Sequence, residues 1–378
     1  MSLVTAFVVA FQLSAAGDID RVVSGAIRDG VFPGAIVVVG TRERTLLARG
    51  YGHFTWSAES QVPDPDSTLF DLASLTKVVA TTPAAMILVD AGWVQLDAPV
   101  QRYLPEFRGE GKGRVTVRHL LEHRSGLRAF LPLNQLAADS AVARRLVLEE
   151  PLRWVPGTRV EYSDLNAMLL GWVVEVVTKR PLEEFVAARV FRPLGMTQTM
   201  FRPARALRPR IVPVGLWRGH AIAGELHDQN AVRLGGVSGH AGLYSSAADL
   251  ARYARFYLRG GVTADGERLV TAATLAEFTR RGPGNRALGW EMNDPTSAEH
   301  TGTLLQADAF GHGGYTGTSI WIDPQRGLFV VVLTNRVFAP RARRSISRLK
   351  VARGEVADAA VALHREVCGA APAATSTC

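Results

Sequence analysis

Apolar residues follow first a helical period and then a strand period at the start of the chain. The segment DIDRVVSGAIRDG, residues 18–30, spaces its apolar residues as an amphipathic helix does and ends at Gly30. The next apolar segments, GAIVVVG and TLLARGYG, are joined by the polar turn TRER, which is typical of two antiparallel strands. The chain is therefore predicted to begin with a helix and a β-hairpin.

Helical periodicity dominates the middle of the chain. Between residues 73 and 234, segments such as KVVATTPAAMILVDAG and LNAMLLGWVVEVVTKR have helical spacing and are separated by Gly and Pro. Pro83 is expected to kink the first of these helices near Val79. From residue 235 strands return: TGTSIWID and GLFVVVLTN flank the turn PQR, and GEVADAAVALHREV predicts a closing helix.

Hairpins at both ends of the chain predict the fold class. They favour an α/β (α+β) fold, in which an antiparallel sheet is flanked by helices and interrupted by an inserted, mostly helical domain. We predict a discontinuous sheet domain of residues 17–72 and 235–367, a helical domain of residues 73–234, and a flexible tail of residues 368–378.

The two ends of the chain bear on its location. Residues 1–16, MSLVTAFVVAFQLSAA, are apolar and end in small residues, as a secretory signal does. They contain no positive residue, so a signal that starts upstream, an uncleaved anchor and a segment covering the domain all stay open. We predict export to the periplasm or cell envelope, and a cytoplasmic location if the segment is not a signal. Cys368 and Cys378 would form a small disulfide in an oxidising compartment, or two free thiols.

The chain is basic, and nearly all of its basicity comes from arginine. The formal net charge is +8, although the chain has only four lysines, Lys77, Lys112, Lys179 and Lys350. The densest basic segment, residues 335–353, has one aromatic residue, Phe338, none within its arginine cluster at residues 341–344, and no reading motif, so we predict no nucleic-acid partner. We interpret it as a solvated face or, functionally, as a means of attraction to an anionic cell envelope.

The segment FDLASLTKVV contains the first candidate for chemistry. Ser74 lies where a helix is predicted to begin, and Lys77 follows at i+3, so the two side chains share a face and one hydrogen-bond network. Free N–H groups and the positive dipole end at a helix start favour negative charge near Ser74. The alternative is a helix cap followed by a solvated lysine. Against it, the neighbours of Lys77 are apolar and are expected to lower its pKa: Leu72, Leu75, Val78 and Val79.

Two further segments fit a nucleophile at Ser74. EYSDLNAMLLG places Tyr162 just ahead of a helix, and a phenol can shuttle protons if a nearby cation lowers its pKa. FGHGGYTGTSIWID places His312 and Gly314 at the entry to a strand, where a carbonyl can approach backbone donors. The imidazole of His312, with an ordinary pKa near 6.5, is an alternative to the pair of Lys77 and Tyr162 as the group that titrates in the acid limb of activity.

These three signatures, in this order, resemble the serine β-lactamase-like superfamily, which includes class C β-lactamases, D-alanyl-D-alanine peptidases and esterase relatives. The resemblance covers nearly all of residues 18–365. It implies a β-lactamase/transpeptidase-like fold with Ser74 as the acylated nucleophile, Lys77 as its proton partner and Tyr162 as general base. His312 stands where the third motif has lysine or histidine, and the backbone N–H groups of Ser74 and Tyr315, next to Gly314, would form the oxyanion hole.

This sequence departs from the superfamily pattern at two positions. The second motif usually reads Tyr-x-Asn, but Asp164 occupies the third place here and an asparagine follows only at Asn166. We expect Asp164 and Asn166 to contact the substrate. The central Thr or Ser of the third motif is Gly313. The resemblance therefore implies weak or no β-lactamase action.

The resemblance implies a serine hydrolase that forms an acyl-enzyme on an amide or ester bond, without a cofactor. A small molecule or peptide derived from peptidoglycan is the expected substrate, as for a D-alanyl peptidase or a muropeptide amidase. A broad carboxylesterase and a penicillin-binding sensor or scaffold without turnover are the alternatives.

Two other motifs have chemical interpretations that we do not favour. HLLEH, residues 119–123, matches a zinc-peptidase pattern, but no third ligand is clearly partnered to it, and the superfamily segment LLxHxSGL explains the same letters. We predict no metal, and a structural role for His123. The glycine-rich LGGVSGHAG around His240 lacks the helix and Lys-Ser/Thr of a phosphate loop, so we predict a tight connecting loop.

Overall fold

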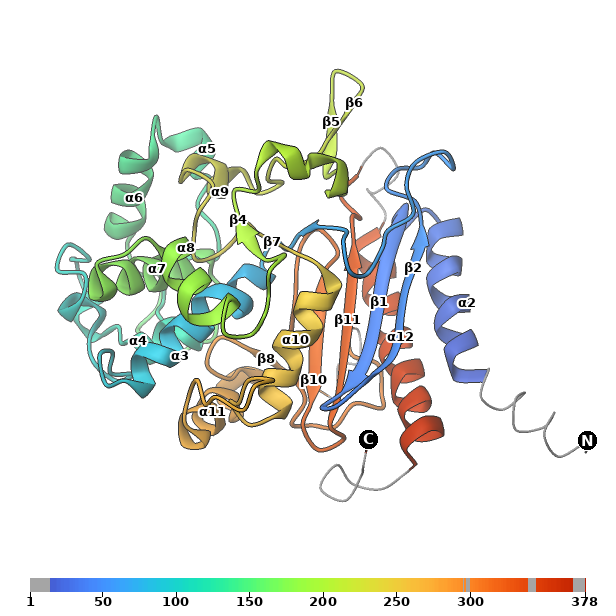
Figure 1. The fold of residues 1–378 in the computed structure, drawn as a ribbon. Helices are drawn as coiled ribbons and strands as arrows, with labels where there is room; N and C mark the ends of the chain where they lie inside the picture. Colours follow the sequence, from blue (N-terminus) through green and yellow to red (C-terminus); the bar gives the residue numbers. More distant parts are fainter. Residues whose placement is uncertain (1–13, 295, 297–299, 339–344, 370–377) are drawn as a thin grey trace, which may run out of the picture.

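The computed structural model describes residues 14–294, 296, 300–338, 345–369 and 378 (Figure 1). Residues 1–13 of the predicted leader lie outside the described residues, and residues 14–16 begin helix α2 (Ser14–Arg28). Within the described part of the chain, no helix combines the length and apolar character that crossing a membrane requires. Cys368 and Cys378 form a disulfide.

A six-stranded antiparallel sheet joins the two ends of the chain, with the order β2-β1-β11-β10-β9-β8. Both predicted hairpins are confirmed: β1 (Gly34–Thr41) pairs with β2 (Thr45–Gly52), and β10 (Ser319–Asp323) pairs with β11 (Leu328–Thr334). The hairpins meet where β1 pairs with β11, with Val37 opposite Val332. The edge is completed by β9 (Phe310–Gly313) and β8 (Glu291–Met292).

The central strands are apolar throughout because the sheet is covered on both faces. Ile36 and Val38 of β1 point into one apolar cluster, whereas Val37 and Val39 point into the other. The second cluster lies under α2 and α12 (Ser345–Cys368), which pack side by side on one face of the sheet (Figure 1). The first lies under α10 (Ala247–Leu258) and continues into the helical part of the molecule.

The middle of the chain is mostly helical, as predicted, and contains two small sheets. The short strands β3 (Phe70–Asp71), β7 (Leu243–Ser245) and β4 (Met200–Phe201) form one sheet, and β5 (Gly215–Trp217) pairs with β6 (His220–Ile222). Besides α2, α10 and α12, the described α-helices are α3 (Thr82–Asp90), α4 (Val117–Leu121), α5 (Leu133–Leu136), α6 (Ser140–Glu149), α7 (Asp164–Thr178), α8 (Leu182–Val186) and α9 (Gln229–Arg233) in the middle of the chain, and α11 (Ala272–Thr279) after it. Short 3-10 turns span Val100–Arg102, Lys112–Arg114, Arg205–Arg210 and Pro283–Asn285, and π-helical turns span Lys77–Thr81 and Ala187–Phe191.

The predicted fold class, an antiparallel sheet flanked by helices with a mostly helical insertion, is confirmed. The boundaries that we gave for the two domains stay a prediction. The candidate catalytic residues come from both parts: Ser74 follows β3, Tyr162 precedes α7, and His312 lies in β9.

Candidate active site

The turn that carries Ser74 is held in an unusual backbone conformation. Ala73 has a φ of 46°, a left-handed conformation that costs energy in a residue with a side chain. The buried carboxylate of Asp71 stabilises it by accepting a hydrogen bond from the Ala73 N–H at 2.9 Å. The chain can therefore turn from β3 directly into a helix, with Ser74 at the corner.

The helix that carries Lys77 begins with a widened turn. The N–H of Thr82 donates to the carbonyl of Lys77 and not to that of Val78, as in a π-helix. The hydroxyl of Tyr253 donates to the Val78 carbonyl instead. Pro83, which has no N–H to donate, follows this turn, and the helix is π-helical over Lys77–Thr81, a feature frequent at functional sites. The kink that we expected near Val79 stays a prediction.

Lys77 lies at the centre of a polar network, although only 3% of its surface is exposed. Its Nζ donates to Ser74 Oγ at 3.0 Å and to the carbonyl of His240 at 3.0 Å. It also forms an ion pair with Asp164 Oδ1 at 2.7 Å. The predicted contact between Ser74 and Lys77 is therefore present.

The predicted lowering of the Lys77 pKa is wrong. Burial among apolar side chains does disfavour the ammonium, as expected. The negative charge of Asp164 and the neighbouring Tyr162 oppose burial and outweigh it, so the pKa is raised above its ordinary value. Lys77 is an ammonium in the resting site.

Tyr162 donates its hydroxyl to Ser74 Oγ at 3.0 Å, so the structure brings the three predicted residues of the first two motifs together. Its ring centroid lies 5.0 Å from Lys77 Nζ. Burial raises the pKa of Tyr162, and Asp164 raises it further, whereas Lys77 lowers it; the net change is upward. Tyr162 is therefore a neutral phenol in the resting site, where the ordinary pKa of a phenol is already near 10.

His312 completes the same side of the site, with its ring centroid 5.8 Å from that of Tyr162. Burial, together with the charges of Arg286 and Lys77, lowers its pKa to about 3. Its Nδ1 lies 2.8 Å from the carbonyl oxygen of Gly313, to which a neutral ring can donate a hydrogen bond. This pKa argues against the alternative in which His312 titrates in the acid limb, because the imidazole is uncharged near neutral pH.

The two residues whose backbone N–H groups are expected to form the oxyanion hole, Ser74 and Tyr315, line the same cleft. Neither the N–H of Ser74 nor that of Tyr315 has a hydrogen-bond partner within the described residues. Residue 314 must be glycine for this arrangement, because a Cβ at this position would collide with Thr318 and with the carbonyl of Leu72. The backbone at Gly314, directly after β9, can therefore lie against the turn that carries Ser74.

Asp164 and Asn166, the residues of the second motif that we expected to contact the substrate, have partners within the protein. Asn166 is 0% exposed: its Oδ1 accepts from Ser125 Oγ at 2.6 Å, and its Nδ2 lies 3.2 Å from His123 Nδ1. The expectation that Asn166 binds substrate is wrong, because this face of α7 points into the protein core. Asp164, the first residue of α7, faces Lys77 and sets the charge of the site.

The segment HLLEH and the glycine-rich loop around His240 have structural contacts that account for their residues. Helix α4 ends at Leu121, so His119 and His123 do not share one helical face. His119 is part of the cap of α4, and His123 Nδ1 accepts from the Ser163 N–H at 3.1 Å. No group of three or more His, Cys, Asp or Glu side chains that could hold a metal ion occurs among the residues described. The loop around His240 packs so tightly that a Cβ on Gly239 would collide with the carbonyl of Ala167.

A cleft of about 520 Å³ opens beside Ser74. It is lined by Ser74, Tyr162, Arg286, Glu291, His300, His312, Gly313, Gly314, Tyr315, Trp321, Ile346, Leu349, Lys350 and Arg353. Three of these residues are Arg or Lys and one is Glu, so the cleft favours an anionic ligand. The sequence analysis missed this feature, because Arg286 lies far in the sequence from Lys350 and Arg353, which both belong to α12.

Arg353 lies beside Gly313, the position at which the third motif usually has a hydroxyl. Its Nη1 lies 3.1 Å from the position that a Cβ on Gly313 would occupy. The side chain is only 8% exposed, and its Nη2 donates to the carbonyls of Gly314 at 3.2 Å and Thr318 at 2.6 Å. Burial and the charge of Arg336 lower its pKa to about 9, so a substrate anion would relieve the cost of keeping this charge buried.

Comparison with known proteins assigns the chain to a family. The model of the Beta-lactamase family matches residues 19–353. A protein of Salmonella agona (strain SL483), named "Putative D-alanyl-D-alanine carboxypeptidase", is 32% identical over 313 residues, which cover 74% of this chain and 72% of that protein. The chain therefore belongs to the Beta-lactamase family and is a serine hydrolase of that family, as the three motifs predicted.

Solved structures have the same fold. A penicillin-binding protein homologue from Caulobacter crescentus has a TM-score of 0.75 at 22% identity, covering 93% of this chain and 98% of that one. EstCE1, a hydrolase with promiscuous acyltransferase activity, has a TM-score of 0.74 at 24% identity, covering 92% and 99%. At these identities the likeness concerns the fold alone.

Proposed function

We propose that the protein is a carboxypeptidase-type serine hydrolase that removes a terminal D-amino acid from cell-wall peptides. The observation that carries the proposal is the basic cleft beside Ser74, because a peptide with a free terminal carboxylate would place that anion near Arg286 and Arg353. The name of the Salmonella relative supports the same substrate class.

In the proposed reaction, Ser74 Oγ attacks the carbonyl carbon of the scissile amide, and the oxyanion accepts hydrogen bonds from the N–H groups of Ser74 and Tyr315. The leaving amine takes a proton from the Tyr162 and Lys77 network, and water then hydrolyses the acyl-enzyme. Because Tyr162 is a phenol and Lys77 an ammonium at rest, the pair must lose one proton before it can accept that of Ser74. The loss of this proton sets the ascending limb of the pH profile.

The proposal is tested with two peptides that end in D-alanyl-D-alanine, one with a free terminal carboxylate and one with a terminal amide. A charged hydrogen bond contributes roughly 1.5 to 3 kcal/mol, so kcat/KM should be on the order of 10- to 100-fold higher for the free acid. Arg286→Gln should reduce this preference. Arg280→Gln is the matched control, because Arg280 is exposed and pairs with Glu277.

Equal cleavage of the two peptides would contradict the carboxypeptidase assignment. Rapid turnover of p-nitrophenyl esters with no peptide cleavage would favour the carboxylesterase alternative. A stoichiometric burst without turnover would favour the sensor or scaffold.

We also propose that the protein acts outside the cytoplasm, associated with the cell envelope. The Cys368–Cys378 disulfide supports this location, because disulfides persist in oxidising compartments. Fractionation of cells that express the full chain tests it, and recovery of all the protein with cytoplasmic markers would exclude it.

A further inference from the structure

One loop, residues 239–243, holds the helix that follows the nucleophile. Three consecutive contacts join them: the Thr76 hydroxyl accepts from the Leu243 N–H at 3.2 Å, Lys77 Nζ donates to His240 O at 3.0 Å, and the Thr81 hydroxyl donates to Gly239 O at 2.7 Å. The central contact is made by the ammonium that faces Ser74. The position of the His240 carbonyl therefore bears directly on the position of Lys77.

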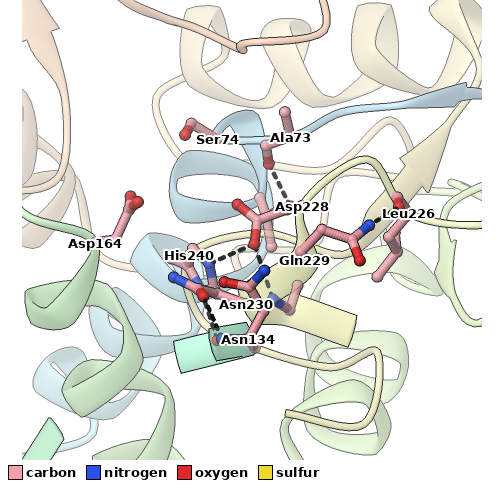
Figure 2. A network of polar contacts seen from close by, with 12 residues as sticks. Ala73, Ser74, Asn134, Asp164, Leu226, Asp228, Gln229, Asn230 and His240 are labelled. Atoms are coloured by element: carbon pink, nitrogen blue, oxygen red, sulfur yellow. Dashed lines mark hydrogen bonds and ion pairs between the residues drawn. The ribbon is translucent and has the colours of Figure 1, made fainter. Parts of the chain in front are cut away.

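The side chain of His240 is fixed at both of its nitrogens. It is 1% exposed, with Nδ1 at 2.7 Å from Ser238 Oγ and Nε2 at 3.2 Å from Asp228 Oδ1. Figure 2 shows the Asp228 side chain directed toward the ring of His240, with Asp164 on a separate element. Contacts at both ring nitrogens restrict rotation of the ring, and through the short Cα–Cβ connection they restrict where the His240 backbone can lie.

Asp228 is itself held in place. It caps α9, where its Oδ1 accepts from the Ala231 N–H at 2.8 Å. Helix α9 is anchored to α5 by Asn230, whose side chain donates to the carbonyl of Leu131 at 2.8 Å and accepts from the Asn134 N–H at 3.2 Å. Asp228 therefore projects from a fixed support.

The same segment also reaches the other side of the nucleophile turn. The N–H of His227 donates to Asp71 Oδ2 at 2.9 Å, and the other oxygen of Asp71 accepts from the Ala73 N–H. The turn before Ser74 and the lysine after it are thus both connected to residues 227–240. Asp228 and His240 do not line the cleft, so this connection is separate from substrate binding.

We propose that Asp228 and His240 are a positioning pair, which holds the His240 carbonyl on the Lys77 ammonium and so keeps Lys77 between Ser74 and Asp164. The inference rests on Lys77 serving the reaction proposed above. A displacement on the order of 1 Å in a catalytic group can cost about 100-fold in rate. Loss of the pair should therefore lower the rate of Ser74 acylation without changing how substrate binds.

The test measures Ser74 acylation by a fluorophosphonate, followed by intact mass, together with kcat and KM. Asp228→Ala should lower the acylation rate and kcat about 10- to 100-fold, with KM within about 2-fold of wild type. Asp228→Asn should restore most of the rate, because the amide oxygen can still accept from His240 and from the Ala231 N–H. In the double variant with His240→Ala the losses should not add, since the two residues act as a unit.

A matched control separates positioning from the loss of a helix cap. Asp139 caps α6 in the same way, accepting from the Val142 N–H at 2.9 Å, and has no contact with the site. Asp139→Ala should acylate at the wild-type rate. A wild-type rate in folded Asp228→Ala, or an equal loss in Asp139→Ala, would overturn the proposal.

Two further measurements keep the test decisive if Asp228→Ala does not fold or if Ser74 is not labelled. Ser238→Ala removes the partner of His240 Nδ1 with little change in volume and should slow acylation several-fold; an unchanged rate would refute the pair. With only four lysines in the chain, the ammonium resonance of Lys77 can be assigned by substitution in 15N-lysine protein. It should shift in Ser238→Ala, which removes a partner of His240, and stay closer to its wild-type position in Asp228→Asn, which keeps the contact with His240. An unshifted resonance in Ser238→Ala would contradict positioning whatever reaction the site performs.

Discussion

Replacing Asp164 with Asn removes the negative charge that faces the Lys77 ammonium, across an Nζ–Oδ1 distance of 2.7 Å. At that separation and an effective dielectric constant of about 20, the Coulomb energy is roughly 6 kcal/mol. The amide oxygen of Asn still accepts a hydrogen bond, and the Asp164 side chain is 16% exposed. We therefore expect the smaller effect that is typical of a carboxylate beside a cation, about 1 to 3 pKa units.

The sign of the effect follows from the direction in which Asp164 acts. For Lys77, burial lowers the pKa and Asp164 raises it. For Tyr162, burial and Asp164 both raise the pKa. Removing the Asp164 charge should lower the macroscopic pKa values of the coupled pair, so the pair loses its proton at lower pH. The ascending limb of kcat/KM should move toward acid by about 1 to 3 pH units.

The assay is the pH dependence of kcat/KM for the wild type and for Asp164→Asn. Asp97→Asn is the control, because Asp97 pairs with Arg118 on the protein surface, and its profile should coincide with that of the wild type. An ascending limb that stays in place in Asp164→Asn, in a protein that is still active and folded, would refute the electrostatic account of the site.

The remaining predictions concern the other groups of the site. Lys77→Ala and Tyr162→Phe should each remove most of the activity, and the double variant should lose little more than the worse single one; strictly additive losses would mean independent roles. His312→Gln should leave the acid limb in place, since His312 has a pKa of about 3 and is neutral wherever the enzyme is assayed; a displaced limb would contradict this. Nitrocefin should be a poor substrate, because Asp164 and Gly313 replace the amide and hydroxyl of the family motifs, and a kcat/KM near the diffusional ceiling would refute that reasoning. Dialysis against a strong chelator should not change hydrolysis, and activity restored by zinc would contradict the interpretation of HLLEH.

The parts of the structure that the sequence predicted are those with a local signal. Unbroken apolar segments of strand length predicted β1 and β11, and the i+3 spacing of Ser74 and Lys77 predicted a contact that the structure contains. In each case the residues that decide the feature are neighbours in the chain.

The predictions that were wrong depended on groups far away in the sequence. The apolar neighbours of Lys77 were identified correctly, but its pKa depends on Asp164, which comes from another helix. The periodicity of α7 did not reveal that Asn166 faces Ser125 and His123. The carbonyl of His240 reaches Lys77 across 163 positions of sequence, and only the fold places Arg353 beside Gly313.

The central claim is that Ser74 forms the acyl-enzyme, and the most direct measurement is the intact mass of the protein after brief exposure to a fluorophosphonate and to a D-alanyl-D-alanine peptide. One adduct per chain, mapped by peptide sequencing to Ser74 and absent from a folded Ser74→Ala variant that has lost several orders of magnitude in turnover, is the result that we predict. An adduct on another residue, or peptide turnover by Ser74→Ala within a few-fold of wild type, would contradict the account.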